Sequence, residues 1–164
     1  MADILLAHGS CHGTWCWEMV LPLLARNGHS AQAIDLPGHG ADQTDVRQVT
    51  LEAYARAIVG AMTDKTVLVG HSMGGYAIAA AACLAPHKVE RLVYLCAYVP
   101  QEGVSLAQRR MQAPRQPVLP AIRMSQDSRS FTIDPQKAVD LFYHDCAPDI
   151  AERAVARLCP QATA

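Results

Sequence analysis

The 164-residue sequence predicts an α/β fold in which a mostly parallel sheet is flanked by helices. Four short runs, at residues 4–7, 30–34, 66–69 and 91–96, have the length of strands, and the first is continuously apolar, as in a strand buried on both faces. Segments with helical patterning separate the runs, and this alternation builds parallel sheets. A Gly-x-Ser-x-Gly motif joins the third run to the helix that follows it.

Three helices are expected between these strands. Thr14 can cap a first helix that continues from residue 15 through Leu24, with Gly28 at its end. Between residues 51 and 62, apolar side chains recur at the i, i+3, i+4, i+7 spacing of an amphipathic helix. Residues 73–84 are rich in alanine, so their small face predicts a helix packed closely against the sheet.

The pattern changes after Pro100. Residues 101–130 contain prolines and arginines with little periodicity and are predicted to be loop-rich. A short strand is expected at residues 131–133, followed by one helix from Asp134-Pro135 through Tyr143 and another from Pro148 through Leu158. We therefore expect an α/β core at residues 1–100 and a cap or lid region at residues 101–164.

Composition excludes several classes of function. Hydrophobic residues make up 51% of the chain and the formal net charge is −1, without a Lys/Arg stripe, so a nucleic-acid partner is not expected. The apolar stretch at 76–85 is too short to span a bilayer, and the N-terminus lacks a secretion-signal pattern, so we expect no membrane association and a cytoplasmic location. The cluster His8, Cys11, His12 and Cys16 fits no standard zinc spacing, and neither a metal nor an organic cofactor is expected.

The Gly70-His71-Ser72-Met73-Gly74 segment carries the chemistry of the chain. A serine on a sharp turn between a strand and a helix projects from the protein surface, where its hydroxyl oxygen can attack a carbonyl. The surrounding glycines, including Gly75, allow strand and helix to approach closely around a strained backbone. The motif indicates a serine hydrolase.

Three segments together resemble a known family. Residues 7–17 (AHGSCHGTWCW), 34–40 (IDLPGHG) and 69–75 (VGHSMGG) are similar to the α/β-hydrolase superfamily, in particular its branch of small esterases related to plant methylesterases and hydroxynitrile lyases. The cap segment 141–146 (LFYHDC) resembles bacterial esterases of that branch. The likeness extends over nearly the whole chain, and the combination of motifs is more specific than the serine motif alone.

The resemblance implies a role for each matching residue. Ser72 corresponds to the nucleophile, the backbone N–H groups of Ser10 and Met73 to the oxyanion hole, and Gly9 and His71 to the borders of the substrate pocket. Lyases of the branch carry threonine at the position of Gly9, so the glycine favours hydrolysis of a small carboxylic ester. A non-catalytic binding module that keeps the pocket, and a lyase of the same branch, remain the alternatives.

The resemblance also predicts that the machinery is incomplete. Members of the branch continue past the cap into two further strands, whose following loops supply the acid and then the histidine of the triad. This chain ends at Ala164, so we expect a C-terminally truncated form that is poorly active alone. Residues 91–96 then form a sheet edge with Leu92, Val93, Tyr94 and Leu95 unprotected, which predicts self-association.

No histidine in the sequence is a convincing general base. His8 is expected to shape the oxyanion turn, His12 to be hydrogen-bonded within its own loop, and His71 to be structural and to point away from the nucleophile. His144 has the right place in chain order, with Asp127, Asp134 or Asp140 as its partner, but it belongs to the cap motif. His87 is expected to be a solvated residue at a helix end. The two tryptophans, Trp15 and Trp17, are expected to be packing anchors rather than residues that stack on a substrate.

Overall fold

The computed structural model describes residues 1–163. Its main sheet is parallel throughout and has the strand order β2-β1-β3-β4. The strands are β1 (Asp3–Ala7), β2 (Ser30–Ile34), β3 (Thr66–His71) and β4 (Val89–Leu95). The ends of each strand lie within two residues of the ends predicted from the sequence. The predicted α/β class is confirmed.

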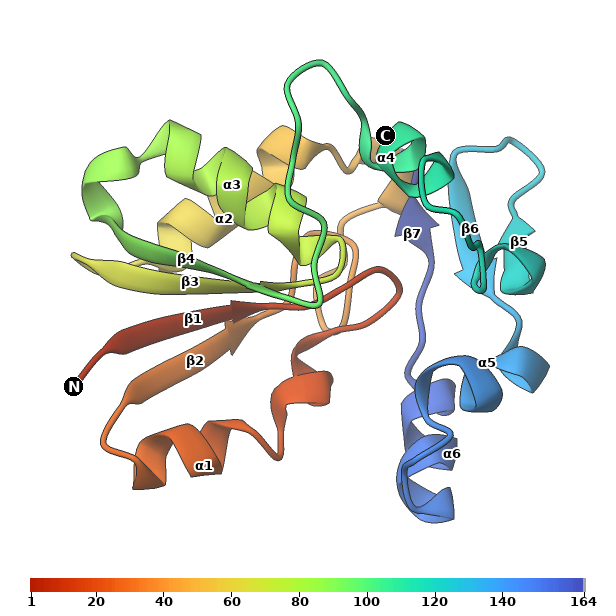
Figure 1. The fold of residues 1–164 in the computed structure, drawn as a ribbon, viewed down its shortest axis with the longest axis horizontal. Helices are drawn as coiled ribbons and strands as arrows, with labels where there is room; N and C mark the ends of the chain where they lie inside the picture. The colour runs from red at the N-terminus through yellow and green to blue at the C-terminus, as the bar shows by residue number, and fades with distance from the viewer. Residues whose placement is uncertain (164) are drawn as a thin grey trace.

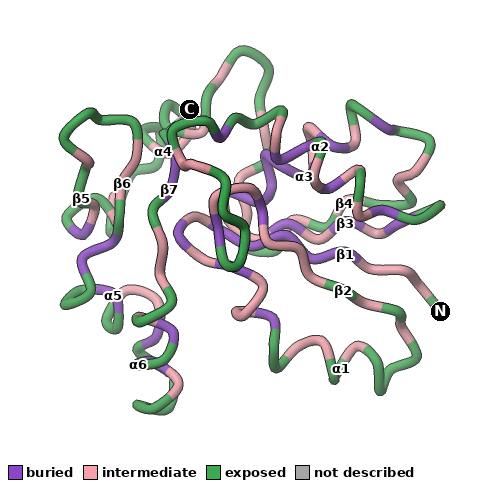
Figure 2. The backbone as a smooth tube through the Cα atoms, turned by 180° about the vertical axis from the view of Figure 1, so that it is seen from behind, coloured by how far each residue is buried: buried purple, intermediate pink, exposed green. Residues whose placement is uncertain are grey.

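Helices lie on both sides of this sheet (Figure 1). Helices α2 (Leu51–Ala61) and α3 (Gly74–Leu84) pack against each other over β3 and β4, whereas the short α1 (Leu21–Arg26) lies on the opposite side, against β2. Helix α2 begins where the Thr50 hydroxyl accepts a hydrogen bond from the backbone N–H of Ala53, a standard N-cap. Figure 2 shows buried residues concentrated in β1, β3 and α3, while α1 contains none.

The prediction of one helix from residue 15 through Leu24 was wrong. The chain instead forms a short 3₁₀ helix, η1 (Thr14–Trp17), and α1 begins only at Leu21. Pro22 explains the break, because proline lacks an N–H and its ring clashes with the carbonyl four residues earlier. Proline is accommodated only in the first turn of a helix, and α1 starts accordingly.

Strand β4 forms one edge of the main sheet in the described residues. Side chains alternate along it: Leu92 and Tyr94 pack against the core, whereas Val93 and Leu95 are 37% and 45% exposed. The expectation that all four would be unprotected was therefore too broad. The apolar border consists of every second residue.

Residues after Pro100 form a separate group of elements beside the carboxyl ends of the main-sheet strands rather than continuing the main sheet (Figure 1). A small antiparallel sheet, β5-β6-β7, is accompanied by three helices. Its strands are β5 (Ile122–Met124), β6 (Ser130–Ile133) and β7 (Gln161–Ala162), and the helices are α4 (Leu106–Met111), α5 (Pro135–Phe142) and α6 (Pro148–Ala156).

The loop-rich prediction for residues 101–130 missed α4 and β5. Helix α4 was missed because its six residues show little apolar periodicity, although Ser105 and Gln108 form a complete capping box at its start. The two-residue β7 was also missed, because its pairing partner β6 lies about thirty residues earlier. Helices α5 and α6 end one and two residues before the predicted ends at Tyr143 and Leu158. Three further 3₁₀ helices complete the described residues: η2 (Val46–Gln48), η3 (Pro86–Lys88) and η4 (Leu119–Ala121).

A buried polar network ties residues 101–163, which we call the cap region for their predicted role, to the main sheet and its helices. Gln161 on β7 accepts a hydrogen bond at Oε1 from Nε2 of His39 at 3.1 Å and donates from its amide nitrogen to the Tyr54 hydroxyl at 3.1 Å. Gln161 and His39 are 5% and 1% exposed. Because buried polar groups are costly when unpaired, this amide fixes where β7 docks. None of the helices in residues 1–163 is long and apolar enough to cross a membrane.

We predict that Gln161→Leu lowers the free energy of unfolding by about 1–3 kcal/mol, because it leaves the buried His39 and Tyr54 groups without their partner. The matched control is Gln43→Leu, since Gln43 is exposed and bonds only the nearby carbonyl of Ala41. Urea unfolding of both variants measures the difference. Equal, small losses in the two variants would contradict the role of the network.

Candidate active site

Ser72 lies on the tight turn between β3 and α3. Its φ angle is +53°, a left-handed conformation that costs a non-glycine residue about 1–3 kcal/mol unless the surroundings enforce it. The Ser72 carbonyl accepts hydrogen bonds from the N–H groups of Gly75 at 3.2 Å and Tyr98 at 3.1 Å, so the turn is held from both sides. This is the geometry of a nucleophile elbow.

Glycines make the close approach around the elbow feasible. A Cβ atom at Gly70 would lie 2.6 Å from the carbonyl oxygen of Gly74, and one at Gly74 would lie 2.8 Å from that of His8. A Cβ atom at Gly75 would overlap the Tyr98 carbonyl. All three obstacles are backbone atoms, which cannot rotate away. Strand, helix and the loop after β1 therefore meet only if these positions are glycine.

The loop after β1 borders the serine. A Cβ atom placed on Gly9 would lie 3.0 Å from Cβ of Ser72 and 3.1 Å from Nδ1 of His71. Within residues 1–163, neither the Ser10 N–H nor the Met73 N–H donates a hydrogen bond. One unused backbone N–H therefore lies on each of the two segments that meet at Ser72: Ser10 on the loop after β1 and Met73 on the β3–α3 turn.

His8 is fully buried and fixes the orientation of one of these donors. Its Nε2 accepts the N–H of Leu36 at 3.1 Å, so the proton lies on Nδ1, which donates to the Gly9 carbonyl at 2.8 Å. Burial lowers the pKa of His8 to about 3, which keeps the ring neutral. The Gly9 carbonyl and the Ser10 N–H share one planar peptide, so the His8 ring also sets the direction of that N–H. The imidazole is structural.

His12 is also engaged on both ring nitrogens. Nδ1 lies 2.8 Å from the Ser10 carbonyl and Nε2 lies 2.8 Å from the Tyr143 hydroxyl, while the ring stacks on Trp15 with centroids 5.1 Å apart. Burial lowers the pKa of His12 below its usual range. The expectation that it is hydrogen-bonded within its own loop was incomplete, because its second partner belongs to the cap.

The Asp-Leu-Pro-Gly-His-Gly segment supports this loop from the core side. The Asp35 carboxylate accepts the N–H of Thr14 at 2.6 Å and that of Ala41 at 3.0 Å, and it fills the space next to Gly40. Together with the bond between Leu36 and His8, these contacts join the loop after β2 to the loop after β1. The motif has a structural role here.

The structure does not assemble the alternative bases. His71 is half-buried and edge-on to Trp17 at 6.3 Å, and burial lowers the pKa of the histidine. His144 is exposed and has no hydrogen bond to any of its three candidate aspartates in the described residues. Asp127 instead bonds Ser125 and Arg129. Asp134 caps α5 and pairs with Arg123. Asp140 is exposed, and so is His87 in η3. Between residues 1 and 163, no histidine is hydrogen-bonded to Ser72.

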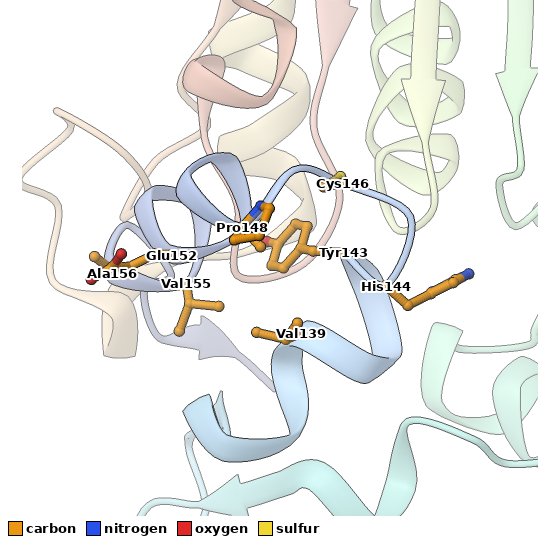
Figure 3. Close-up of a pocket in the computed structure, with 9 residues that line it drawn as sticks. Val139, Tyr143, His144, Cys146, Pro148, Glu152, Val155 and Ala156 are labelled. Atoms are coloured by element: carbon orange, nitrogen blue, oxygen red, sulfur yellow. The ribbon is translucent and has the colours of Figure 1, made fainter.

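A groove of about 560 Å³ lies on the cap between α5 and α6 (Figure 3). Val139 and Val155 face each other across it and the Tyr143 ring lies between the two helices, while His144 points away. Neither Ser72 nor the loop after β1 contributes to its lining. The groove is therefore separate from the serine site.

The sequence did not predict two residues that support the loops after β1 and β2. Tyr143 reaches His12 across 131 positions, and Gln161 reaches His39 across 122. No local pattern encodes such contacts. The only signal for Tyr143 was its place in the cap segment 141–146 that resembles bacterial esterases.

The chain belongs to the α/β-hydrolase family, whose model matches residues 4–164. Among curated relatives, Methylesterase 1 of Arabidopsis thaliana is 42% identical over 103 residues, covering 58% of this chain and 39% of the relative. Esterase PIR7B of Oryza sativa subsp. japonica is 40% identical over 106 residues, covering 60% of this chain and 40% of the relative. The chain thus spans about two fifths of the length of the curated relatives it matches.

Solved structures support the same fold. A methylesterase from Arabidopsis superimposes with a TM-score of 0.81 at 22% identity, covering 99% of this chain and 67% of its own. A tomato methylketone synthase gives 0.86 at 22% identity, covering 99% and 69%, and a pyrethroid hydrolase gives 0.81 at 27%, also covering 99% and 69%. The predicted resemblance to the α/β-hydrolase superfamily is confirmed.

We predict that Gly70→Ala destabilises the protein by about 1–3 kcal/mol, because its methyl group would overlap the Gly74 carbonyl. The control is Gly60→Ala in α2, where nothing lies within 4 Å of the added carbon. Alanine should stabilise that helical position by about 0.5–1 kcal/mol. Thermal and urea unfolding should therefore give shifts of opposite sign, and shifts of the same sign would refute the packing argument.

Proposed function

We propose that the protein is a carboxylic-ester hydrolase that uses Ser72 as its nucleophile. The observation that carries this proposal is the left-handed serine on the β3–α3 turn, next to two backbone N–H groups without acceptors in residues 1–163. Supporting evidence comes from the esterase names of the relatives that align with the first part of the chain. The substrate class is a small carboxylic ester.

The proposed reaction follows from these positions. The Ser72 hydroxyl oxygen attacks the ester carbonyl carbon, and the negative charge that develops on the carbonyl oxygen is stabilised by the N–H groups of Ser10 and Met73. Each donor of this kind contributes about 3–4 kcal/mol to lowering the barrier. The tetrahedral intermediate expels the alcohol and leaves an acyl-serine, which water then hydrolyses to the acid.

Efficient turnover also requires a histidine base and a carboxylate that orients it. The ring nitrogens of His8, His12 and His39 bind other groups, and His71 has no carboxylate partner among the described residues. We therefore propose that the 164-residue chain is poorly active by itself, since the Ser72 proton must pass to water. Loss of one triad member typically lowers kcat by a factor on the order of 10⁴–10⁶.

Gly9 favours an ester over a cyanohydrin as the substrate. The lyases that this chain resembles carry threonine at this position, whereas here a Cβ atom would lie only 3.0 Å from the Ser72 Cβ, so a side chain would crowd the nucleophile. We propose that Gly9 and His71 border the substrate pocket. We also propose that the region from residue 101 onward acts as the cap over this pocket. As its location we propose the cytoplasm.

The nucleophile is tested by labelling with a fluorophosphonate probe. Attack by the Ser72 oxygen on phosphorus forms the O–P bond, expels fluoride and releases the hydroxyl proton to water. We expect slow, stoichiometric labelling of the intact chain that Ser72→Ala abolishes. The matched control is Ser128→Ala, because Ser128 shares the left-handed backbone (φ +56°) but lies in the cap hairpin. Labelling that survives Ser72→Ala would overturn the assignment.

We further propose that the chain self-associates through the edge of the main sheet. Strand β4 exposes unpaired backbone groups on its outer side, together with the apolar side chains of Val93 and Leu95. Edge-to-edge pairing with a second copy would satisfy both.

We predict that the chain forms dimers or larger species and that Leu95→Lys shifts it towards monomer, because a charged edge residue opposes pairing. Leu23→Lys on α1 is the control, since Leu23 is 47% exposed against 45% for Leu95 but lies away from the edge. Size-exclusion chromatography with light scattering measures the masses. A wild-type monomer, or equal effects of both substitutions, would show that the edge is not the interface.

A further inference from the structure

His12 connects the cap to the loop that carries the Ser10 N–H. Its Nδ1 lies 2.8 Å from the Ser10 carbonyl, which can only accept, so the proton must lie on Nδ1. A neutral imidazole then has a bare Nε2, and the Tyr143 hydroxyl at 2.8 Å must donate to it. One tautomer therefore satisfies both contacts, and the donation runs from Tyr143 through His12 to Ser10.

Packing holds this arrangement in place. The His12 ring lies flat against Trp15 and edge-on to Phe142, whose centroid is 5.9 Å away. Tyr143 is only 8% exposed, and it lies between α5 and α6 (Figure 3). The Cys11 carbonyl in the same loop accepts the N–H of Cys159, a second contact from the cap. The ring consequently has little freedom to turn.

The two peptides that flank Ser10 are held by different parts of the protein. His8, in the core, holds the Gly9 carbonyl and hence the peptide that contains the Ser10 N–H. His12, whose ring is set by the cap, holds the carbonyl of Ser10 itself. The φ and ψ torsions of Ser10 connect these two planar peptides. Because both peptides are held, the direction of the Ser10 N–H depends on both contacts.

We propose that His12 and Tyr143 are positioning residues for the Ser10 N–H, so that the cap pre-orients one donor of the oxyanion hole. The inference rests on the proposed serine esterase chemistry. Neither side chain touches the reacting atoms, and their effect passes through the Ser10 peptide. Loss of the Tyr143 hydroxyl should misalign the N–H without removing it.

The experiment compares Tyr143→Phe with the intact chain. Phosphonylation of Ser72 by a fluorophosphonate is followed over a range of probe concentrations, which separates the limiting rate from probe binding. We expect the limiting rate to fall about 3- to 10-fold with binding unchanged, a typical size for indirect coupling. Tyr76→Phe is the matched control, since Tyr76 is also 8% exposed and its hydroxyl donates to the Val104 carbonyl, outside the loop.

A second readout is spectroscopic and does not depend on any reaction at Ser72. Nitrogen-15 NMR of the wild-type imidazoles should show His12 protonated at Nδ1, with an Nε2 signal that shifts in Tyr143→Phe. A wild-type His12 protonated at Nε2 would overturn the proposal, as would an unchanged limiting rate in a folded Tyr143→Phe protein. Absence of Ser72 labelling in the wild type would instead overturn the proposed function, while a control that loses as much rate as Tyr143→Phe would overturn the positioning role.

Discussion

The close contact between the β3–α3 turn and the loop after β1 is the constraint on which the rest of the site depends. Ser72 adopts a left-handed backbone there, and both the Gly70 and Gly74 positions face carbonyl oxygens too near for a side chain. The strain at Ser72 persists because its carbonyl is held by two N–H groups. If the β3–α3 turn lay further from the loop after β1, the unused N–H groups of Met73 and Ser10 would not be on neighbouring segments.

The loop after β1 is fixed by polar side chains rather than by regular hydrogen-bonded structure. His8 and Asp35 anchor it to the loop after β2, and His12 anchors it to the cap. Burial lowers the pKa of both histidines, so each keeps one bare nitrogen as an acceptor and one N–H as a donor. Directional bonds of this kind orient a peptide group more sharply than apolar contacts do.

The cap does more than follow the core in sequence. It contributes Gln161 to a buried network with His39 and Tyr54, and Tyr143 to the ring of His12. Both contacts end on segments next to the carboxyl ends of the sheet strands. The separate groove between α5 and α6 shows that the cap has its own apolar surface, to which the serine site contributes nothing.

The sequence by itself determined the four parallel strands, the family and the position of the serine, because these depend on local features. Apolar runs, helical spacing and the Gly-x-Ser-x-Gly motif lie within a few residues of the structures they specify. It also predicted β4 as an edge, although only alternate residues such as Val93 proved exposed. Only the tertiary structure decided the distant partners of the buried histidines, the break before Pro22 and the small sheet completed by β7. Each of His8, His12 and His39 has one partner close in the chain and one that lies 28 to 131 positions away. A hydrogen bond between distant residues leaves no periodic trace in the sequence.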